Sequence, residues 1–151
     1  MDVDGTLTDG KIYMGNDGEV MKAFDIKDGY GINNLLPQAG IIPVIITGRK
    51  SFIVENRCKE LDIKNLYQGV SNKVELLNTF LSEQNGVLSE VAYIGDDLND
   101  LPCMNLIKDN GGILGAPSNA RNEIKEIATF TSNSKGGEGA VRDFIEWLIK
   151  I

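Results

Sequence analysis

Asp2 and Asp4 stand one residue apart near the start of the chain, directly before Gly5. Alternate residues of an extended backbone point the same way, and a turn at glycine leaves both carboxylates at the carboxyl end of a strand, where open α/β sheets bind ligands. The pair suits phosphoryl transfer, because one carboxylate can attack phosphorus while the other handles protons. The motif is short, and an acidic hydrogen-bonded turn is the alternative interpretation.

Two later segments offer groups that bind phosphate oxygens. The apolar stretch 41–46 ends in Thr47 and Gly48, which predicts a hydroxyl and a free backbone amide at the carboxyl edge of the sheet. Lys73 opens a predicted helix and supplies a point charge for phosphate. The alternatives are that Thr47 caps the next helix and that Lys73 is an ordinary solvated lysine.

An acidic loop follows the apolar stretch 91–94. It carries Asp96, Asp97 and Asp100, and three carboxylates directly after a buried strand require a compensating cation. Oxygen ligands of this kind suit Mg²⁺, which favours carboxylates together with a substrate phosphate. A solvated acidic turn is the alternative here.

Composition narrows the function further. The 151 residues are 42% hydrophobic and carry 15 basic against 22 acidic residues, a net charge of -7 without a basic tract. One domain over residues 1–151 is expected, and a nucleic-acid surface is not. No apolar run approaches the roughly 18 to 20 residues that span a membrane, so a cytoplasmic location is expected by default. The chain has no histidine, which excludes a Ser-His-Asp triad. Neither cysteine begins a Cys-x5-Arg loop and no Gly-x4-Gly-Lys-Ser/Thr loop exists, so carboxylates must do any chemistry.

The elements that must position these residues alternate between apolar and amphipathic segments. Strands are expected at the remnant ending at Asp2 and at 41–47, 66–67, 91–94 and 112–114, and helices at 29–39, 51–61, 72–83, 99–107, 119–127 and 140–149. Residues 11–14 and 19–24 flank Gly-Asn-Asp-Gly, which predicts a projecting β-hairpin with positive φ at Gly and Asn/Asp. The order predicts a doubly wound, Rossmann-like α/β fold with a parallel sheet and helices on both faces. About four to six apolar residues are expected upstream of Asp2 in a buried strand, so the first strand looks clipped.

Taken in order, the aspartate pair, Thr47, Lys73 and the acidic loop resemble the haloacid dehalogenase superfamily of aspartate-nucleophile phosphotransferases over nearly the whole chain. The resemblance implies that Asp2 is the nucleophile and that Asp4 is the acid and base. It also implies that Thr47 and Lys73 hold the phosphoryl group, that Mg²⁺ is bound by the Asp2 carboxylate, the Asp4 carbonyl and Asp96, and that Asp97 and Asp100 orient metal waters and the loop.

The chain leaves no room for the cap domain that many members of this superfamily carry. Only the hairpin lies between residues 9 and 25, and 25 residues separate Thr47 from Lys73. An open catalytic face would admit water, so neighbouring subunits are expected to close it, with the hairpin as the docking element.

Within the superfamily, the stretches 12–16, 22–24, 27–32, 46–51 and 136–142 resemble the capless 3-deoxy-D-manno-octulosonate 8-phosphate phosphatases. That resemblance implies a Mg²⁺-dependent homotetramer that hydrolyses this sugar acid phosphate through an aspartyl-phosphate in lipopolysaccharide precursor synthesis. By position, it implies a substrate site made of Asp4, Asp25, Ile26, Lys27, Asp28, Gly29, Asn33, Gly48, Arg49, Arg57 and Lys73. Arg49 and Arg57 suit a sugar acid chemically, because a guanidinium binds a carboxylate through two hydrogen bonds; an exposed surface pair is the alternative.

The chain departs from that family at Thr6, where a small aliphatic residue is more usual, and at Asn33 and Glu138, where arginine is common. Two alternatives therefore stay open: a phosphatase for a nine-carbon sugar acid 9-phosphate, or a non-catalytic oligomerisation module related to the C-terminal domains of acylneuraminate cytidylyltransferases. A phosphomutase is disfavoured because no cap excludes water. The glycine-rich tail 134–139 is expected to be flexible and to reach a neighbour's active site as a lid.

Overall fold

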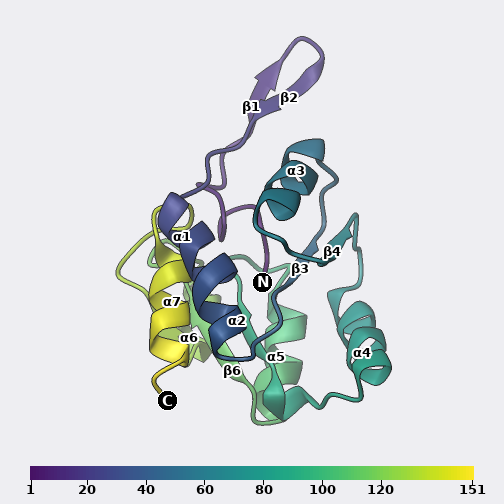
Figure 1. Cartoon of the computed structure of the whole chain (residues 1–151), viewed down its shortest axis with the longest axis vertical. Coiled ribbons are helices and arrows are strands. Elements are labelled where there is room, and N and C mark those ends of the chain that lie inside the picture. The colour runs from purple at the N-terminus through teal and green to yellow at the C-terminus, as the bar shows by residue number, and fades with distance from the viewer.

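The computed structural model describes residues 1–151 (Figure 1). The strands are β1 Tyr13–Gly15, β2 Gly18–Met21, β3 Val44–Thr47, β4 Asn65–Gln68, β5 Ala92–Ile94, β6 Ile113–Ala116 and β7 Phe130–Thr131. The α-helices are α1 Ile26–Tyr30, α2 Leu36–Gln38, α3 Phe52–Glu60, α4 Lys73–Gln84, α5 Leu101–Asp109, α6 Asn122–Ile127 and α7 Ala140–Leu148. A π-helical segment, Gly31–Leu35, joins α1 to α2, and a short 3₁₀ helix, Leu88–Glu90, precedes β5.

The first two residues connect two groups of parallel strands. Strand β3 pairs with β4, and β5 pairs with β6, which pairs with β7, all parallel. Between the groups, the Ile46 N–H donates to the Met1 carbonyl at 3.0 Å and the Asp2 N–H donates to the Ile94 carbonyl at 3.1 Å. The spatial order is therefore β4, β3, residues 1–2, β5, β6, β7, which is the predicted parallel α/β sheet with Asp2 at its centre.

An apolar groove of about 560 Å³ runs on from Met1 between β3 and β5. It is lined by Ile42, Val44 and Ala92 among other apolar residues, together with side chains of α4 and α7. The amino group of Met1 donates to the Val44 carbonyl at the end of this groove.

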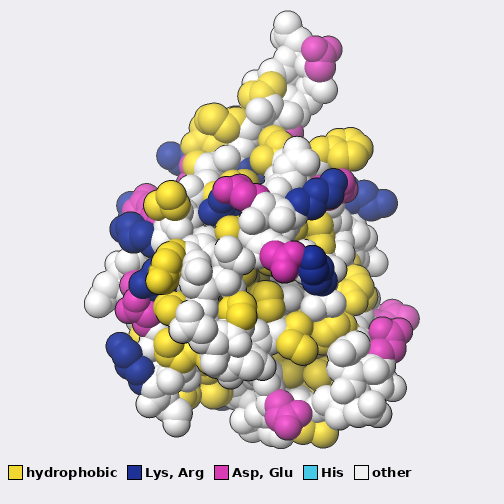
Figure 2. Space-filling model, in the orientation of Figure 1, with side chains coloured by type: hydrophobic (Ala, Val, Ile, Leu, Met, Phe, Trp, Pro, Cys, Tyr) yellow, Lys and Arg dark blue, Asp and Glu magenta, His cyan; other side chains and the backbone are white.

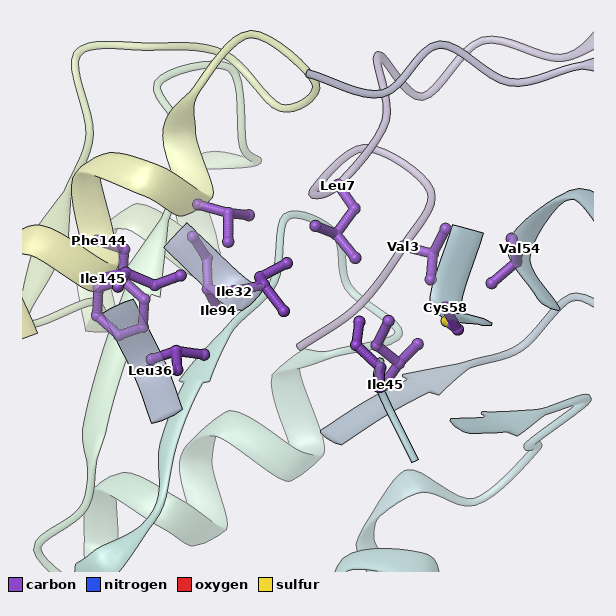
Figure 3. Packing of buried hydrophobic residues seen from close by; sticks show 12 residues of the cluster. Val3, Leu7, Ile32, Leu36, Ile45, Val54, Cys58, Ile94, Phe144 and Ile145 are labelled. Atoms are coloured by element: carbon purple, nitrogen blue, oxygen red, sulfur yellow. The ribbon is translucent and has the colours of Figure 1, made fainter. Parts of the chain in front are cut away.

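Helices cover both faces of the sheet, and each face has its own core. On one face, Val3, Ile45 and Ile94 pack with residues of α3 and α7 and of the π-helical segment (Figure 3). On the other, Tyr93 and Leu114 pack with α4, α5 and α6. Neighbouring residues Tyr93 and Ile94 thus face opposite cores, as the two-residue period of a strand requires. No cap domain covers the sheet edge, and none of the helices is long and apolar enough to cross a membrane.

The hairpin of β1 and β2 stands away from the rest of the molecule (Figure 1). An antiparallel bridge between Thr8 and Phe24 closes its base. In its turn only Gly18 has a positive φ, 115°, so the expected positive φ at Asn16 or Asp17 was wrong.

Several boundaries differ from those predicted. The helix expected to begin at residue 29 begins at Ile26, because Asp25 caps it by accepting the Lys27 N–H at 2.6 Å. The strand expected from residue 41 begins at Val44. Helices α5 and α6 begin two and three residues later than expected, and the two-residue strand β7 was missed.

The expected flexibility of the glycine-rich tail was wrong. Residues 134–139 pack on residues 5–9 of the same chain, where the Gly137 N–H donates to the Thr6 carbonyl at 3.1 Å. A Cβ on Gly136 would lie 1.8 Å from the Gly5 carbonyl oxygen. The glycines therefore serve close backbone contact, which their composition alone does not distinguish from flexibility. A lid over a neighbouring subunit's site stays a prediction.

Candidate active site

A buried group of one lysine, two aspartates and a tyrosine forms the centre of the site. Lys73 Nζ donates to Asp2 Oδ1 at 2.7 Å and to Asp100 Oδ1 at 2.6 Å, and lies 3.3 Å from the Tyr93 hydroxyl. The Tyr93 hydroxyl donates to the same Asp100 oxygen at 2.7 Å. Lys73 is only 6% exposed, so it is not a solvated helix lysine. Its positive charge compensates the Asp2 and Asp100 carboxylates, which are shielded from solvating water.

Local structure explains how these residues meet. Asp2 follows the central backbone ladder, Thr47 ends β3, and the acidic loop begins directly after β5, so all three lie at one edge of the parallel sheet. Lys73 begins α4, whose N-cap Asn72 accepts the Glu75 N–H. Thr47 is buried and does not cap α3, whose N-cap is Ser51.

Asp96 reaches Asp2 because Gly5 leaves space for it. Gly5 has a φ of 95°, and a Cβ there would lie 2.0 Å from Asp96 Oδ2. Thr6 Oγ1 donates to Asp96 Oδ1 at 3.0 Å, which gives the unusual Thr6 a direct role at the site. The loop is held by Asp100, whose Oδ2 accepts the N–H groups of Asp96 and Asp97 at 3.1 and 3.4 Å, while the Asp97 side chain caps the Leu98 N–H at 2.7 Å.

Burial and mutual repulsion raise the pKa values of two of these carboxyls. Burial, followed by the charge of Asp100, raises the pKa of Asp2 to about 6 against the opposing effect of Lys73. Burial, followed by the charge of Asp2, raises the pKa of Asp96 to about 7. Burial alone would lower the pKa of Lys73, but the charges of Asp2 and Asp100 outweigh it and raise that pKa, so Lys73 stays protonated. The site therefore carries excess negative charge that a cation relieves.

The oxygen atoms fit a small divalent cation. One oxygen each of Asp2, Asp96 and Asp100 lie within 4.8 Å of one another. Both oxygens of Asp100 are engaged by hydrogen bonds, so Asp2 and Asp96 are the carboxylates with free capacity. The Asp4 carbonyl accepts no hydrogen bond, which leaves it available as well. This set of hard oxygen donors is the kind that Mg²⁺ prefers.

Asp4 belongs to a second charged network at the mouth of the site. Lys22 Nζ donates to Asp4 Oδ1 and lies 3.0 Å from Glu19 Oε1. Glu19 also accepts from Arg49 at 3.2 Å and from Ser51 Oγ at 2.7 Å. Burial raises the pKa of Glu19, but the hydrogen bonds from Ser51 and Lys22 and the charges of Lys22 and Arg49 outweigh it and lower that pKa below its usual value.

Of the remaining predicted substrate residues, Arg57 and Gly29 contact each other near the base of the hairpin. Arg57 lies near this end of the sheet, where its guanidinium stacks 5.6 Å from the Phe24 ring, reaches the Asp25 carbonyl at 3.5 Å and pairs with Glu60 at 2.8 Å. Gly29 admits that guanidinium, because a Cβ there would lie 2.4 Å from it.

Other residues of the predicted substrate set are less directly placed. Ile26 and Lys27 are exposed on α1, Gly48 is exposed after β3, and the exposed Asn33 side chain makes no hydrogen bond. Asp28 is buried beneath α7, where Oδ1 accepts the Arg142 N–H at 2.8 Å and Oδ2 has no partner. Burial raises its pKa to about 6. Asp28 thus contacts the start of α7 and not the aspartate group.

Sequence reasoning missed Lys22, Glu19 and Tyr93 as members of the site. Nothing in the spacing of a hairpin lysine indicates that it is buried, because its partner Asp4 lies on a different segment. Tyr93 carried a usable signal: a tyrosine inside an otherwise aliphatic buried strand needs a partner for its hydroxyl.

Comparison with known proteins places the chain among phosphatases. The family model described as haloacid dehalogenase-like hydrolase matches residues 65–145. The 3-deoxy-D-manno-octulosonate 8-phosphate phosphatase KdsC of Salmonella typhi is 44% identical over 149 residues, which cover 99% of this chain and 77% of that protein. The crystal structure of the phosphatase of that name from Moraxella catarrhalis, in complex with magnesium, phosphate and KDO, superposes with a TM-score of 0.90 at 38% identity and covers 99% of this chain and 83% of that one. A cobalt-bound Haemophilus influenzae phosphatase superposes with a TM-score of 0.90 at 32% identity, covering 99% and 84%.

Proposed function

Because the chain belongs to the haloacid dehalogenase-like hydrolase family, we propose that it hydrolyses 3-deoxy-D-manno-octulosonate 8-phosphate to the free sugar acid and phosphate in the presence of Mg²⁺. The observation that carries the proposal is the group of Asp2, Lys73 and Asp96 at the carboxyl edge of the sheet, with Asp2 and Lys73 buried, in a chain 44% identical to phosphatases of that substrate. Pathway and location follow as proposals: lipopolysaccharide precursor synthesis in the cytoplasm.

In the proposed reaction, Asp2 attacks phosphorus and displaces the sugar oxygen, which takes a proton from Asp4. Asp4 then accepts a proton from the water that attacks the aspartyl-phosphate, and this second step releases phosphate and restores Asp2. Lys73, held beside Asp2, and the buried Thr47 hydroxyl stabilise the charge on the phosphoryl oxygens. Most of the acceleration in such a site comes from positioning and electrostatics.

Mg²⁺ would be held by the carboxylates of Asp2 and Asp96 and by the Asp4 carbonyl, where it supplies positive charge to the phosphoryl oxygens. Asp100 organises this arrangement by fixing Lys73 and the acidic loop, and Asp97 shapes the loop from its exposed side. The raised pKa values of Asp2 and Asp96 support the assignment, because they record the electrostatic cost of these carboxylates without a cation.

We propose that Arg49 and Arg57, the guanidinium groups near the base of the hairpin, determine substrate specificity. Arg49 lies within 4.0 Å of Asp4, and Arg57 lies beside Asp25, so the two guanidinium groups can receive the sugar carboxylate. The rest of the proposed substrate site follows the family positions Ile26, Lys27, Asp28, Gly29, Asn33 and Gly48. Asp28 would act there through the start of α7, given its contact with the Arg142 N–H.

We propose that residues 1–151 act as one domain and assemble as a homotetramer through the hairpin. Figure 2 shows hydrophobic side chains on the projecting hairpin and around its base. Met14 and Val20 on the hairpin, Ile26 on α1 and Phe52 on α3 are all more than half exposed. Apolar surface of this kind on a projecting element favours an interface with another copy.

The test is phosphate release from 3-deoxy-D-manno-octulosonate 8-phosphate and from nine-carbon sugar acid 9-phosphates, with Mg²⁺ and with a chelator. We expect Mg²⁺-dependent preference for the eight-carbon substrate and no turnover by Asp2→Asn, with its fold intact by circular dichroism. Preference for a nine-carbon substrate would retain the chemistry and change the pathway. Absence of activity on every substrate would favour the oligomerisation module.

A further inference from the structure

Lys22 is buried at the base of the hairpin, directly after β2. Its side chain is 1% exposed, and its ammonium group meets two carboxylates, those of Asp4 and Glu19. An ammonium group withdrawn from water loses several kcal/mol of hydration, so it persists only where its partners are close and well placed. Lys22 and Lys73 are the two buried lysines of the chain, and each binds one of the aspartates of the amino-terminal pair.

The two oxygens of Asp4 have different surroundings. Oδ1 is held by Lys22, whereas Oδ2 has only Arg49 nearby, at 4.0 Å. The Asp4 side chain is 24% exposed, so without Lys22 it could rotate toward solvent. With Oδ1 fixed, Oδ2 is the oxygen left to meet a substrate atom.

Glu19 keeps Lys22 in place. It contacts Lys22 on one side and Ser51 and Arg49 on the other, so it joins the hairpin to the loop that follows β3. Lys22 therefore lies between the Glu19 carboxylate, which other residues hold in place, and the Asp4 carboxylate, which has no other close partner. Arg49 is too exposed, at 43%, to hold Asp4 in the same way.

We propose that Lys22 is a positioning residue that holds one oxygen of the Asp4 carboxylate and thereby aims the other at the leaving-group oxygen of the substrate. The inference rests on the role of Asp4 in the proposed function. It makes the hairpin part of the catalytic machinery, in addition to its proposed place in assembly. A residue that acts only by aiming a proton donor matters most for substrates whose leaving group needs that proton.

The experiment compares two leaving groups in Lys22→Met. An alkoxide leaves from 3-deoxy-D-manno-octulosonate 8-phosphate and needs a proton, whereas nitrophenolate leaves from p-nitrophenyl phosphate without one. The ratio kcat/KM is the right measure, because it covers only the steps up to departure of the first product. We expect kcat/KM to fall by about 10- to 100-fold for the sugar phosphate and by less than about threefold for the aryl phosphate. Lys64→Met, the same change at an exposed lysine outside the site, should leave both values unchanged.

Asp4→Asn separates this inference from the proposed function. If Asp4→Asn shows the same selective loss, and adding Lys22→Met to it causes no further loss, the two residues act as a unit and the inference stands. If Asp4→Asn is selective but Lys22→Met reduces both substrates equally, or neither, the positioning role is overturned while the function survives. If Asp4→Asn is not selective, the acid role of Asp4 fails and the inference fails with it.

Two further variants keep the test decisive if Lys22→Met folds poorly. Lys22→Arg keeps the positive charge and should recover part of the lost activity on the sugar phosphate. Lys22→Gln offers a hydrogen bond without a charge and should show the same selective loss in milder form. Equal activity of both variants on both substrates, relative to the wild type, would overturn the positioning role.

Discussion

Asp96→Asn should stabilise the metal-free protein near neutral pH and destabilise it, relative to wild type, when Mg²⁺ is present. The pKa of Asp96 rises from 3.8 to about 7 on folding, so the native state binds a proton more tightly than the unfolded chain. Its contribution to stability is complete below pH 4 and is lost as the pH rises through 7. Asparagine keeps the shape and the acceptor for Thr6 but carries no charge.

The magnitude follows from that shift. Ionisation of Asp96 alone lowers the free energy of unfolding by about 2 kcal/mol between pH 4.5 and 6, and by about 3 kcal/mol between pH 4.5 and 7.5. Asp2 and Asp28, whose pKa values are also raised to about 6, act in the same direction. The Met1 amino group acts oppositely, because burial lowers its pKa from 8.0 to about 6, but only between pH 6 and 8.

The assay is urea unfolding of both proteins from pH 4.5 to 7.5, in EDTA and in Mg²⁺. In EDTA the wild type should lose stability with rising pH, and the variant should lose about 2 kcal/mol less between pH 4.5 and 6. Mg²⁺ should stabilise the wild type by mass action and the variant much less. A metal-free variant no more stable than wild type at pH 7.5, or equal stabilisation of both by Mg²⁺, would refute the electrostatic account of the site.

Three further outcomes are expected. Tyr93→Phe removes a hydroxyl that donates to a buried carboxylate, so it should lower unfolding free energy by about 1–3 kcal/mol in urea titrations, and kcat should fall with it. Met14→Asp with Val20→Asp on the exposed hairpin should yield monomers by light scattering and reduce turnover, whereas an unchanged tetramer would exclude that interface. Gly136→Ala places a Cβ 1.8 Å from the Gly5 carbonyl oxygen and should displace the loop of residues 5–9; unchanged kcat and melting temperature would contradict that close contact.

The spacing of apolar residues, together with the turn and capping residues between apolar segments, was enough to predict the sheet and its helices. Apolar runs of four to six residues marked β3 and β5, and the acidic or hydroxyl residues behind them marked the edge where ligands bind. The errors at β7 and at the glycine-rich tail arose where contacts distant in sequence decide the structure. Strand β7 is two residues long and exists because it pairs with β6, and the tail is ordered because its glycines fit against residues 5–9.

The site was predictable to the extent that its residues end strands. Thr47 and Asp96 follow apolar stretches that end at the same sheet edge, and the backbone of residues 1–2 is hydrogen-bonded between those two strands, so the proximity of Asp2, Thr47 and Asp96 follows from the topology. Lys22 and Asp28 do not follow that rule. Lys22 is buried because the hairpin returns to Asp4, and Asp28 is buried because Arg142 in the first turn of α7, 114 residues further along the chain, lies over it.

Each of the two buried lysines, Lys22 and Lys73, binds a different member of the aspartate pair. Lys73 comes from the start of α4 and binds Asp2, the proposed nucleophile, in the interior. Lys22 comes from the hairpin, the element that the catalytic domain adds outside its sheet, and binds Asp4 at the mouth. A force that displaces the hairpin, such as the proposed contact with a neighbouring subunit, would therefore act first on Asp4, the proposed acid, and leave Asp2, the proposed nucleophile, in place. Assembly through the hairpin would then tune protonation of the leaving group without altering the phosphoryl-binding centre.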